Sequence, residues 1–253
     1  MTLPAVLVTG GAKRIGRAIT QRFGRVGWHV VIHYRSSAAE AEALAASLPS
    51  AEVIQCELTD AAAVARMMSD LAARLPDWRC CIASAAMFQP DGADLLDEAV
   101  FDRMLAVNAK ATVRLLQLYL AHASAPHGRR AIAITDQKLA NPNPDFFSYT
   151  LSKAALGGAV PLLAMAATRV EDRVYALAPG AILPSHDQTA EETEVSHRLN
   201  LLHRKTAVDE VANACLFLAE GPLASGETLF LDSGQHLLRQ PRDVIYLARQ
   251  QQS

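Results

Sequence analysis

A tyrosine and a lysine four positions apart have the clearest chemical potential in this sequence. Tyr149 and Lys153 lie in the segment YTLSKAAL. Side chains four residues apart on a helix share one face, so the phenol and the ammonium lie close together. A phenol with a pKa of about 10 is a reluctant acid, and a neighbouring ammonium lowers that pKa by stabilising the phenolate. The pair predicts a proton relay, although the same spacing alone would also describe two solvent-exposed side chains.

A carboxyl group precedes this pair. Asp136 follows the apolar run RAIAIT and lies thirteen residues before Tyr149. Reduction of a C=N bond needs a hydride at carbon and a proton at nitrogen, and a carboxyl–phenol pair is able to relay that proton. An ionised carboxylate beside a ketone oxygen would instead repel the negative charge that develops there. Asp136 therefore favours C=N reduction, with a turn or N-cap residue as the alternative interpretation.

A glycine-rich turn, TGGAKRIG, follows the first apolar run and precedes the first helical pattern. Glycines at this place let the backbone approach a pyrophosphate that the helix N-terminus binds. The turn therefore predicts a dinucleotide site rather than an ordinary strand-to-helix connection. The expected contacts are Gly10, Lys13, Arg14, Ile15 and Gly16.

The end of the second apolar run, HYRSS, indicates which dinucleotide is bound. An enzyme that uses NAD typically places an acid here to bind the ribose 2′-hydroxyl. Arg35 with its neighbouring serines suits a 2′-phosphate instead, through charge-assisted hydrogen bonds. The sequence therefore predicts NADPH as the cofactor, in contact with His33, Tyr34, Arg35 and Ser36.

Together these motifs resemble the short-chain dehydrogenase/reductase superfamily. The turn follows its TG-x-x-x-G-x-G fingerprint, with Arg14 in place of the second glycine of that fingerprint. That arginine, the segment HYRSSAAEA and the spacing Asp-x12-Tyr-x3-Lys are similar to the pteridine reductases and related dihydropterin reductases. The resemblance covers nearly the whole chain. It implies an NADPH-dependent enzyme that reduces a dihydropterin of the dihydrobiopterin, dihydromonapterin or dihydrofolate type to its tetrahydro form.

The resemblance also implies roles for further residues. Asn108 matches an asparagine that supports the lysine through a bound water, and its alternative role is to cap or kink a helix. Phe88 matches a phenylalanine that stacks on the pterin, although a lone aromatic is more often part of the core. The implied substrate contacts are Arg14, Phe88, Asp136 and Tyr149. The remaining implied cofactor contacts are Glu57, Leu58, Ser84, Ala85, Tyr149, Lys153, Pro179 and Gly180.

One segment departs from the family pattern. Where members usually carry Asn-Asn-Ala-Gly or Asn-Asn-Ala-Ser, this chain reads Ala83-Ser84-Ala85-Ala86 and lacks a carboxamide and a serine hydroxyl. Two other functions stay open. One is a carbonyl or 3-oxoacyl reductase of the same superfamily, and the other is a non-catalytic NADPH-binding regulatory protein. The intact tyrosine and lysine argue against the second.

The elements that position these residues alternate between strand and helix patterns, which is typical of βαβ units. The alternation predicts one α/β domain over residues 1–253: a Rossmann-like, doubly wound parallel sheet of about seven strands, with helices on both faces and ligands at the strand carboxyl ends. Strands are expected at 5–9, 29–33, 52–56, 79–83, 130–135, 173–178 and 228–231. Helices are expected from Ile15 to near 27, at 38–48, from an N-cap at Asp60 to about 75, at 98–122, around Tyr149 and at 208–218. Residues 181–205 form a candidate substrate lid, and the tail at 239–253 has a helical pattern.

Composition excludes several other classes of protein. A net charge of −2 and a hydrophobic content of 51% argue against a disordered chain and against nucleic acid as a partner. The N-terminus lacks the pattern of a signal peptide, and no apolar run reaches the roughly 20 residues that span a bilayer, so we expect a cytoplasmic protein without membrane contact. The four cysteines and eight histidines lack metal-ligand spacing, so we expect free thiols and no metal. The superfamily resemblance implies a homotetramer.

Overall fold

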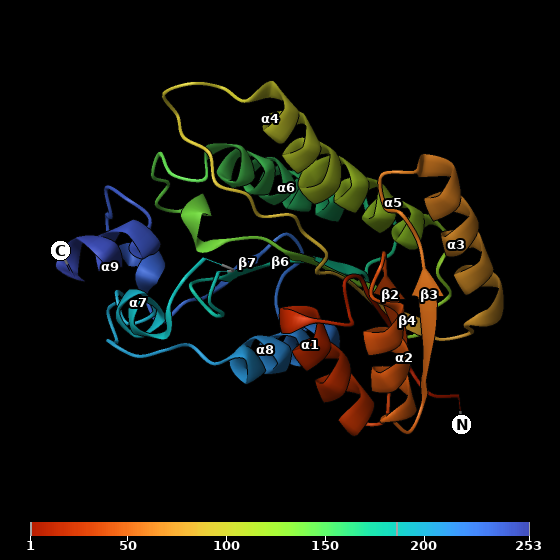
Figure 1. Cartoon of the computed structure of the whole chain (residues 1–253). Coiled ribbons are helices and arrows are strands. Elements are labelled where there is room, and N and C mark those ends of the chain that lie inside the picture. Colours follow the sequence, from red (N-terminus) through yellow and green to blue (C-terminus); the bar gives the residue numbers. More distant parts are fainter. Residues whose placement is uncertain (1, 186, 253) are drawn as a thin grey trace.

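The computed structural model describes residues 2–185 and 187–252, which contain one parallel sheet (Figure 1). Its seven strands lie in the order β3-β2-β1-β4-β5-β6-β7, and every neighbouring pair is parallel. The strands are β1 (Ala5–Val8), β2 (His29–Tyr34), β3 (Ala51–Gln55), β4 (Trp78–Ala83), β5 (Arg130–Ile134), β6 (Arg173–Pro179) and β7 (Thr228–Leu231). The predicted doubly wound sheet is confirmed, with each strand end within one residue of its predicted position.

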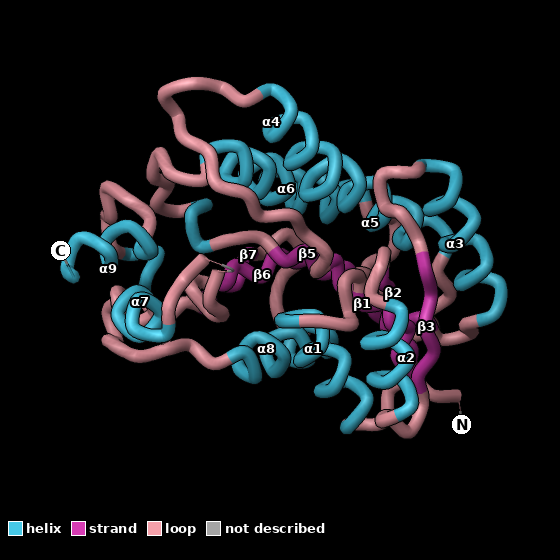
Figure 2. Tube along the Cα trace, viewed as in Figure 1, coloured by secondary structure: helices cyan, strands magenta, loops and turns pink. Residues whose placement is uncertain are grey.

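Helices cover both faces of the sheet (Figure 2). On one face lie α3 (Ala61–Arg74), α5 (Thr112–His122) and α6 (Phe147–Ala166), and on the other lie α1 (Arg14–Arg25), α2 (Ala38–Ala46) and α8 (Val208–Glu220). Each face has its own hydrophobic cluster. The neighbours Cys80 and Cys81 point to opposite clusters, as expected for successive residues of a strand. All four cysteines are buried and free, as predicted.

The helix predicted over residues 98–122 contains a wider turn. It begins as α4 (Glu98–Met104), continues as the π-helical segment η1 (Leu105–Ala111) and ends as α5. Asn108 lies within η1 and is buried. Single π-helical turns inside longer helices occur frequently at functional sites. The alternative interpretation of Asn108 as a residue at a helix irregularity therefore also holds.

The candidate lid contains a short helix that the sequence pattern left undefined, and the C-terminal tail contains a helix, as its pattern predicted. In the lid, α7 (Ala190–Ser196) begins with a capping box between Thr189 and Glu192. In the tail, α9 (Val244–Gln252) packs against α7 at one end of the molecule (Figure 1). His186 and Ser253, which belong to the predicted lid and tail, lie outside the described residues.

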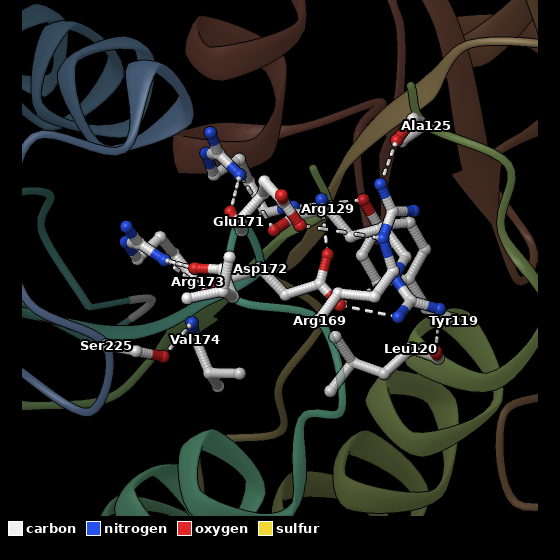
Figure 3. A network of polar contacts seen from close by, with 12 residues as sticks. Tyr119, Leu120, Ala125, Arg129, Arg169, Glu171, Asp172, Arg173, Val174 and Ser225 are labelled. Carbon is white, nitrogen blue, oxygen red and sulfur yellow. Dashed lines mark hydrogen bonds and ion pairs between the residues drawn. The ribbon is translucent and has the colours of Figure 1, made fainter. Parts of the chain in front are cut away.

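A buried ion pair joins the amino ends of two central strands (Figure 3). The guanidinium Nε of Arg129 donates to Asp172 Oδ2 at 2.9 Å, and the backbone N–H of Arg129 donates to Asp172 Oδ1 at 2.8 Å. Strands β5 and β6 begin directly after these two residues. Removal of one partner of a buried ion pair typically costs about 3–5 kcal/mol, because the other charge is left uncompensated. The pair therefore fixes the two strands that lead, at their far ends, to Asp136 and Pro179.

Candidate active site

A cavity of about 680 Å³ opens at the carboxyl ends of the strands. Sites for small molecules and cofactors typically measure roughly 300–1,000 Å³, and in open α/β sheets they lie where the strand order reverses. Here that point is β1, with β2 on one side and β4 on the other. Every predicted site residue except Asn108 lines this one cavity.

Asp136 and Tyr149 meet in the cavity. Tyr149 Oη donates to Asp136 Oδ2 at 3.1 Å, and the backbone N–H of Lys138 donates to Asp136 Oδ1 at 2.9 Å. Asp136 is thus also the N-cap of the short 3₁₀ helix η2 (Gln137–Leu139). The alternative interpretation of Asp136 as an N-cap is therefore confirmed, while its second oxygen meets Tyr149 and its catalytic role stays a prediction.

The electrostatic environment keeps the phenol protonated. Burial raises the pKa of Asp136 above its usual range, and the ammonium groups of Lys138 and Lys153 act against that rise. Burial, followed by the charge and hydrogen bond of Asp136, raises the pKa of Tyr149 well above its usual value. The pKa of Tyr149 is therefore not lowered overall, because burial and the carboxyl of Asp136 both favour the neutral phenol, and the contribution predicted for Lys153 stays a prediction. The Tyr149 phenol therefore holds its proton at neutral pH, and its hydrogen bond to Asp136 fixes the direction of the hydroxyl.

Lys153 shares a helix face with Tyr149, as its spacing predicts. Its Nζ donates to the carbonyl oxygen of Ile134 at 2.7 Å and lies 5.6 Å from the centre of the Tyr149 ring. Burial lowers the pKa of Lys153 to about 8, and the nearby Asp136 opposes this shift. The lysine is therefore held between the end of β5 and the phenol ring.

Asn108 links the loop after β4 to α6. Its side chain accepts the N–H of Met87 at 2.8 Å and donates to the Met87 carbonyl at 2.9 Å and to Ser152 Oγ at 3.0 Å. Phe88 follows Met87, and Lys153 follows Ser152. Through these contacts Asn108 fixes the backbone next to Phe88 and the side chain next to Lys153. Its support of Lys153 through water stays a prediction.

The glycine-rich turn is wound too tightly for side chains at its key positions. Gly10 has a φ of +63°, and a Cβ at Gly16 would lie 2.2 Å from the carbonyl oxygen of Gly10. Helix α1 begins at Arg14 without a side-chain cap from Lys13 and without an acidic residue in its first turn. Its first backbone N–H groups therefore face no competing side-chain acceptor at the cap. This geometry fits the pyrophosphate of a dinucleotide.

Two further side chains shape the turn. Arg14 has a φ of +52°, a left-handed conformation that explains why the family fingerprint has glycine at this position. Its guanidinium donates to the Pro184 carbonyl at 2.9 Å and so bridges the turn to the segment after β6. His33 is buried, accepts the Gly10 N–H on Nδ1 at 3.2 Å and bonds the Cys56 carbonyl through Nε2 at 3.0 Å. His33 therefore supports the turn from within the sheet, and its burial lowers its pKa.

The nucleotide-selecting residues lie beyond the ends of β2 and β3. Arg35 is exposed, and its guanidinium lies 4.0 Å from the Glu57 carboxylate. Glu57 also accepts the backbone N–H and the hydroxyl of Thr59, at 3.0 and 2.9 Å. Because Glu57 has these other partners and Arg35 lies at the surface, the guanidinium is accessible to a phosphate.

The unusual segment after β4 is still tied to β1. Thr9 Oγ1 accepts the backbone N–H groups of Ser84 and Ala85, each at 3.0 Å. A threonine hydroxyl therefore fixes the start of this loop although the usual asparagine is missing. Ser84 and Ala85 consequently lie beside the glycine-rich turn, where the cofactor contacts were predicted.

Phe88 belongs to an aromatic cluster that includes Tyr149. Its ring stacks on Phe146 with the ring centres 4.3 Å apart and meets Tyr149 edge-on at 4.8 Å. The Phe146 ring in turn stacks on Tyr246 of α9 at 6.0 Å. Phe88 thus lies within a row of rings that runs from Tyr149 to the C-terminal helix.

Sequence reasoning missed several residues that line the cavity. Lys138 follows Asp136 on η2, and Asp243, Val244 and Ile245 come from the start of the C-terminal helix. The lid adds a further group, which includes Gln188 and His197. No local pattern reveals these contacts, because they depend on the approach of segments that are distant in the chain.

Within the described residues, no helix is long and apolar enough to cross a membrane, and no group of three or more His, Cys, Asp or Glu side chains could hold a metal ion. The cytoplasmic location and the homotetramer stay predictions.

Comparison with known proteins shows the family. The family described as enoyl-(acyl carrier protein) reductase matches residues 10–236. The chain belongs to this family of short-chain dehydrogenases/reductases and is an oxidoreductase.

Three relatives illustrate the range of activities within the family. FolM alternative dihydrofolate reductase 1 from Brucella canis, solved in complex with NADP, superposes with a TM-score of 0.87 at 35% identity, over 95% of this chain and 96% of that chain. The probable galactose dehydrogenase GalD of Rhizobium meliloti (strain 1021) is 28% identical over 92% of this chain and 99% of its own length. Pteridine reductase 1 of Leishmania tarentolae is 24% identical over 94% of this chain and 98% of its own length.

Proposed function

We propose that this protein is an NADPH-dependent reductase of dihydropterins of the dihydrobiopterin, dihydromonapterin or dihydrofolate type. The observation that carries the proposal is the 3.1 Å hydrogen bond between the Tyr149 phenol and the Asp136 carboxyl inside the cavity. Similarity to the NADP-bound FolM structure and to pteridine reductase 1 supports it. The contact also disfavours a non-catalytic regulatory protein, which has no need for a buried acid pair.

NADPH fits the residues around the glycine-rich turn and would supply the hydride when bound. The uncapped N-terminus of α1 and the tight turn at Gly10 would hold its pyrophosphate. Arg14 would contact a phosphate, and Arg35 with Ser36 would bind the 2′-phosphate. Lys153 would bind the ribose.

The chain's own residues supply the proton. Reduction converts a C=N bond to CH–NH, so one hydride at carbon must be matched by one proton at nitrogen. Tyr149 donates that proton, and Asp136 in its protonated form, favoured by the burial that raises its pKa, returns one to the phenolate and is itself reprotonated from solvent. The aromatic ring of Phe88 offers a flat surface on which a pterin would stack.

A carbonyl reductase of the same family is the second candidate, favoured by the similarity to the galactose dehydrogenase. Against it stands Asp136, which occupies the place where most family members carry a serine that donates to a carbonyl oxygen. A carboxylate at this point would repel the charge that forms on that oxygen.

The direct test is NADPH oxidation, followed by absorbance, with dihydrobiopterin, dihydromonapterin and dihydrofolate as separate substrates. We expect turnover with at least one of them, together with formation of its tetrahydro product. Parallel assays with NADH test the predicted cofactor preference. Lack of turnover with all three dihydropterins would rule the function out.

The strained backbone at Arg14 gives a prediction in which stability and affinity change in opposite directions. Arg14→Gly removes the cost of a left-handed residue and is expected to raise the free energy of unfolding by about 0.5–1 kcal/mol. The lost guanidinium is expected to weaken NADPH binding by about 10–100-fold, as loss of a charged hydrogen bond does. Denaturant unfolding and NADPH fluorescence titration measure the two quantities.

His203 provides a matched control, because it has a φ of +50° and is exposed away from the cavity. His203→Gly should stabilise the protein to a similar degree and leave NADPH affinity unchanged. Equal NADPH affinity in wild type and Arg14→Gly would show that the side chain has no role in binding.

A further inference from the structure

The C-terminal segment, defined as residues 242–252, contacts the loop that carries Asp136. Lys138 Nζ lies 2.7 Å from Asp243 Oδ2, and the two side chains are only 5% and 11% exposed. The backbone N–H of the same lysine donates to Asp136 at 2.9 Å. One residue therefore joins the C-terminal segment directly to the carboxyl that accepts from Tyr149.

A second row of contacts runs in parallel. The Tyr246 ring stacks on Phe146, Phe146 stacks on Phe88, and Phe88 meets Tyr149 edge-on. Lys138 Nζ lies 5.2 Å from the centre of the Phe146 ring, so the two rows touch. The C-terminal segment thus reaches both members of the proton-donating pair.

Ion pairs hold this segment at both ends. Arg242 Nε donates to Asp145 Oδ2 at 2.8 Å, and the backbone N–H of Asp243 donates to the same oxygen at 2.7 Å. At the far end, Arg249 Nε donates to Glu192 of α7 at 2.9 Å. Between these anchors, Val244 and Ile245 line the cavity.

We propose that Lys138 and Asp243 are positioning residues for the proton-donating pair: their ion pair seats the C-terminal segment as a wall of the cavity and balances the charge beside Asp136. This inference deepens the proposed function and rests on it. Neither residue donates the proton. Their role is to hold the carboxyl in place and to keep the net charge around it near zero.

The charges around Asp136 support this balance. The groups that face it are Tyr149 and Lys153 from α6, Lys138 from η2 and Asp243 from the C-terminal segment. Lys138 lowers the pKa of Asp136 and Asp243 raises it, while Asp243 also raises the pKa of Tyr149. Loss of Lys138 or of Asp243 should therefore shift the apparent pKa of the Asp136–Tyr149 pair. The direction of the shift depends on which of the two charges remains.

The test uses pH profiles of kcat for dihydropterin reduction. The reaction needs the protonated pair, so the rate falls as pH rises through the apparent pKa of the site. Asp243→Asn removes the negative partner of Lys138. The alkaline limb of the profile, where the rate falls, is then expected to move to lower pH by about one unit. Lys138→Met leaves the Asp243 charge and is expected to move the limb up by a similar amount. The double variant should restore the wild-type limb. Lys153 titrates in the same range and responds to both changes in the same directions.

Controls separate this role from a merely structural one. NADPH affinity, measured by fluorescence, should stay within about twofold in all three variants. Arg74→Gln breaks an exposed pair with Glu52 outside the cavity and should leave the profile unchanged. Hydrogen exchange of residues 242–250 should accelerate in both single variants, independently of turnover.

The inference would be overturned if the alkaline limb moved in the same direction in both single variants. It would also be overturned if the limb moved in neither. If the single variants fail to fold, the neutral double variant decides: a limb within about 0.3 units of wild type supports the balance, and a larger displacement refutes it. If the wild-type protein turns over no dihydropterin, the proposed function fails. Hydrogen exchange still tests the ion pair in that case: faster exchange of residues 242–250 in the single variants shows that the pair seats the segment, and unchanged exchange shows that it does not.

Discussion

Replacement of Tyr149 with phenylalanine is expected to lower kcat for dihydropterin reduction by about 10²–10⁴-fold, the usual contribution of a positioned acid. The change removes the hydroxyl that donates to Asp136 and keeps the ring that packs against Phe88. NADPH affinity should therefore stay within about twofold, because the packing around the cofactor site is retained. Steady-state kinetics and fluorescence titration give the two values.

Tyr175→Phe is the matched control for this variant. Tyr175 is also buried and donates to the Leu223 carbonyl at 2.7 Å, but it does not line the cavity. The same loss of a hydroxyl should cost about 1 kcal/mol of stability there and leave kcat unchanged. A Tyr149→Phe enzyme with near wild-type kcat would show that the proton comes from another source.

The second large effect concerns the substrate. Asp136→Ser is expected to lower kcat/KM for dihydropterins by about 10²-fold or more, because the carboxyl that returns the proton to Tyr149 is lost. Reduction of a ketone, such as an oxoacyl thioester, should be unchanged or faster, because a hydroxyl donates to a carbonyl oxygen without repelling its charge. Assays of both substrate classes with the same enzyme preparation measure the ratio.

Asp136→Asn distinguishes chemistry from helix capping. Serine and asparagine are both good N-caps, so each should keep the bond from the Lys138 N–H that begins η2. Neither returns a proton to the phenol, so both should lose dihydropterin reduction to a similar degree. Wild-type activity in the asparagine variant would mean that Asp136 serves only as a cap.

Local spacing was sufficient for much of the site. Tyr149 and Lys153 share a helix face because four residues make about one helical turn. The glycine-rich turn could be placed beside a strand and a helix because both flanking patterns are short and regular. The segment 98–122 was predicted as a helix, but its π-helical turn was not, since the hydrophobic pattern continues through that turn.

The electrostatics of the site could not be predicted from spacing. Lys153 was expected to lower the pKa of Tyr149, but burial and the neighbouring Asp136 raise that pKa overall. The direction of that shift depends on which charged group lies within hydrogen-bond distance and on how deeply the pair is buried. Both are properties of the folded chain.

By itself the sequence determined the parallel sheet, the order of strands and helices along the chain, and the candidate turn, tyrosine, lysine and aspartate of the site. Only the tertiary structure decided that the C-terminal segment completes the cavity, through contacts such as Arg242 to Asp145, 97 residues apart. The physical reason is that periodicity reports contacts within one or two turns of the backbone. Contacts between distant segments depend on how whole elements pack, and no local pattern records that.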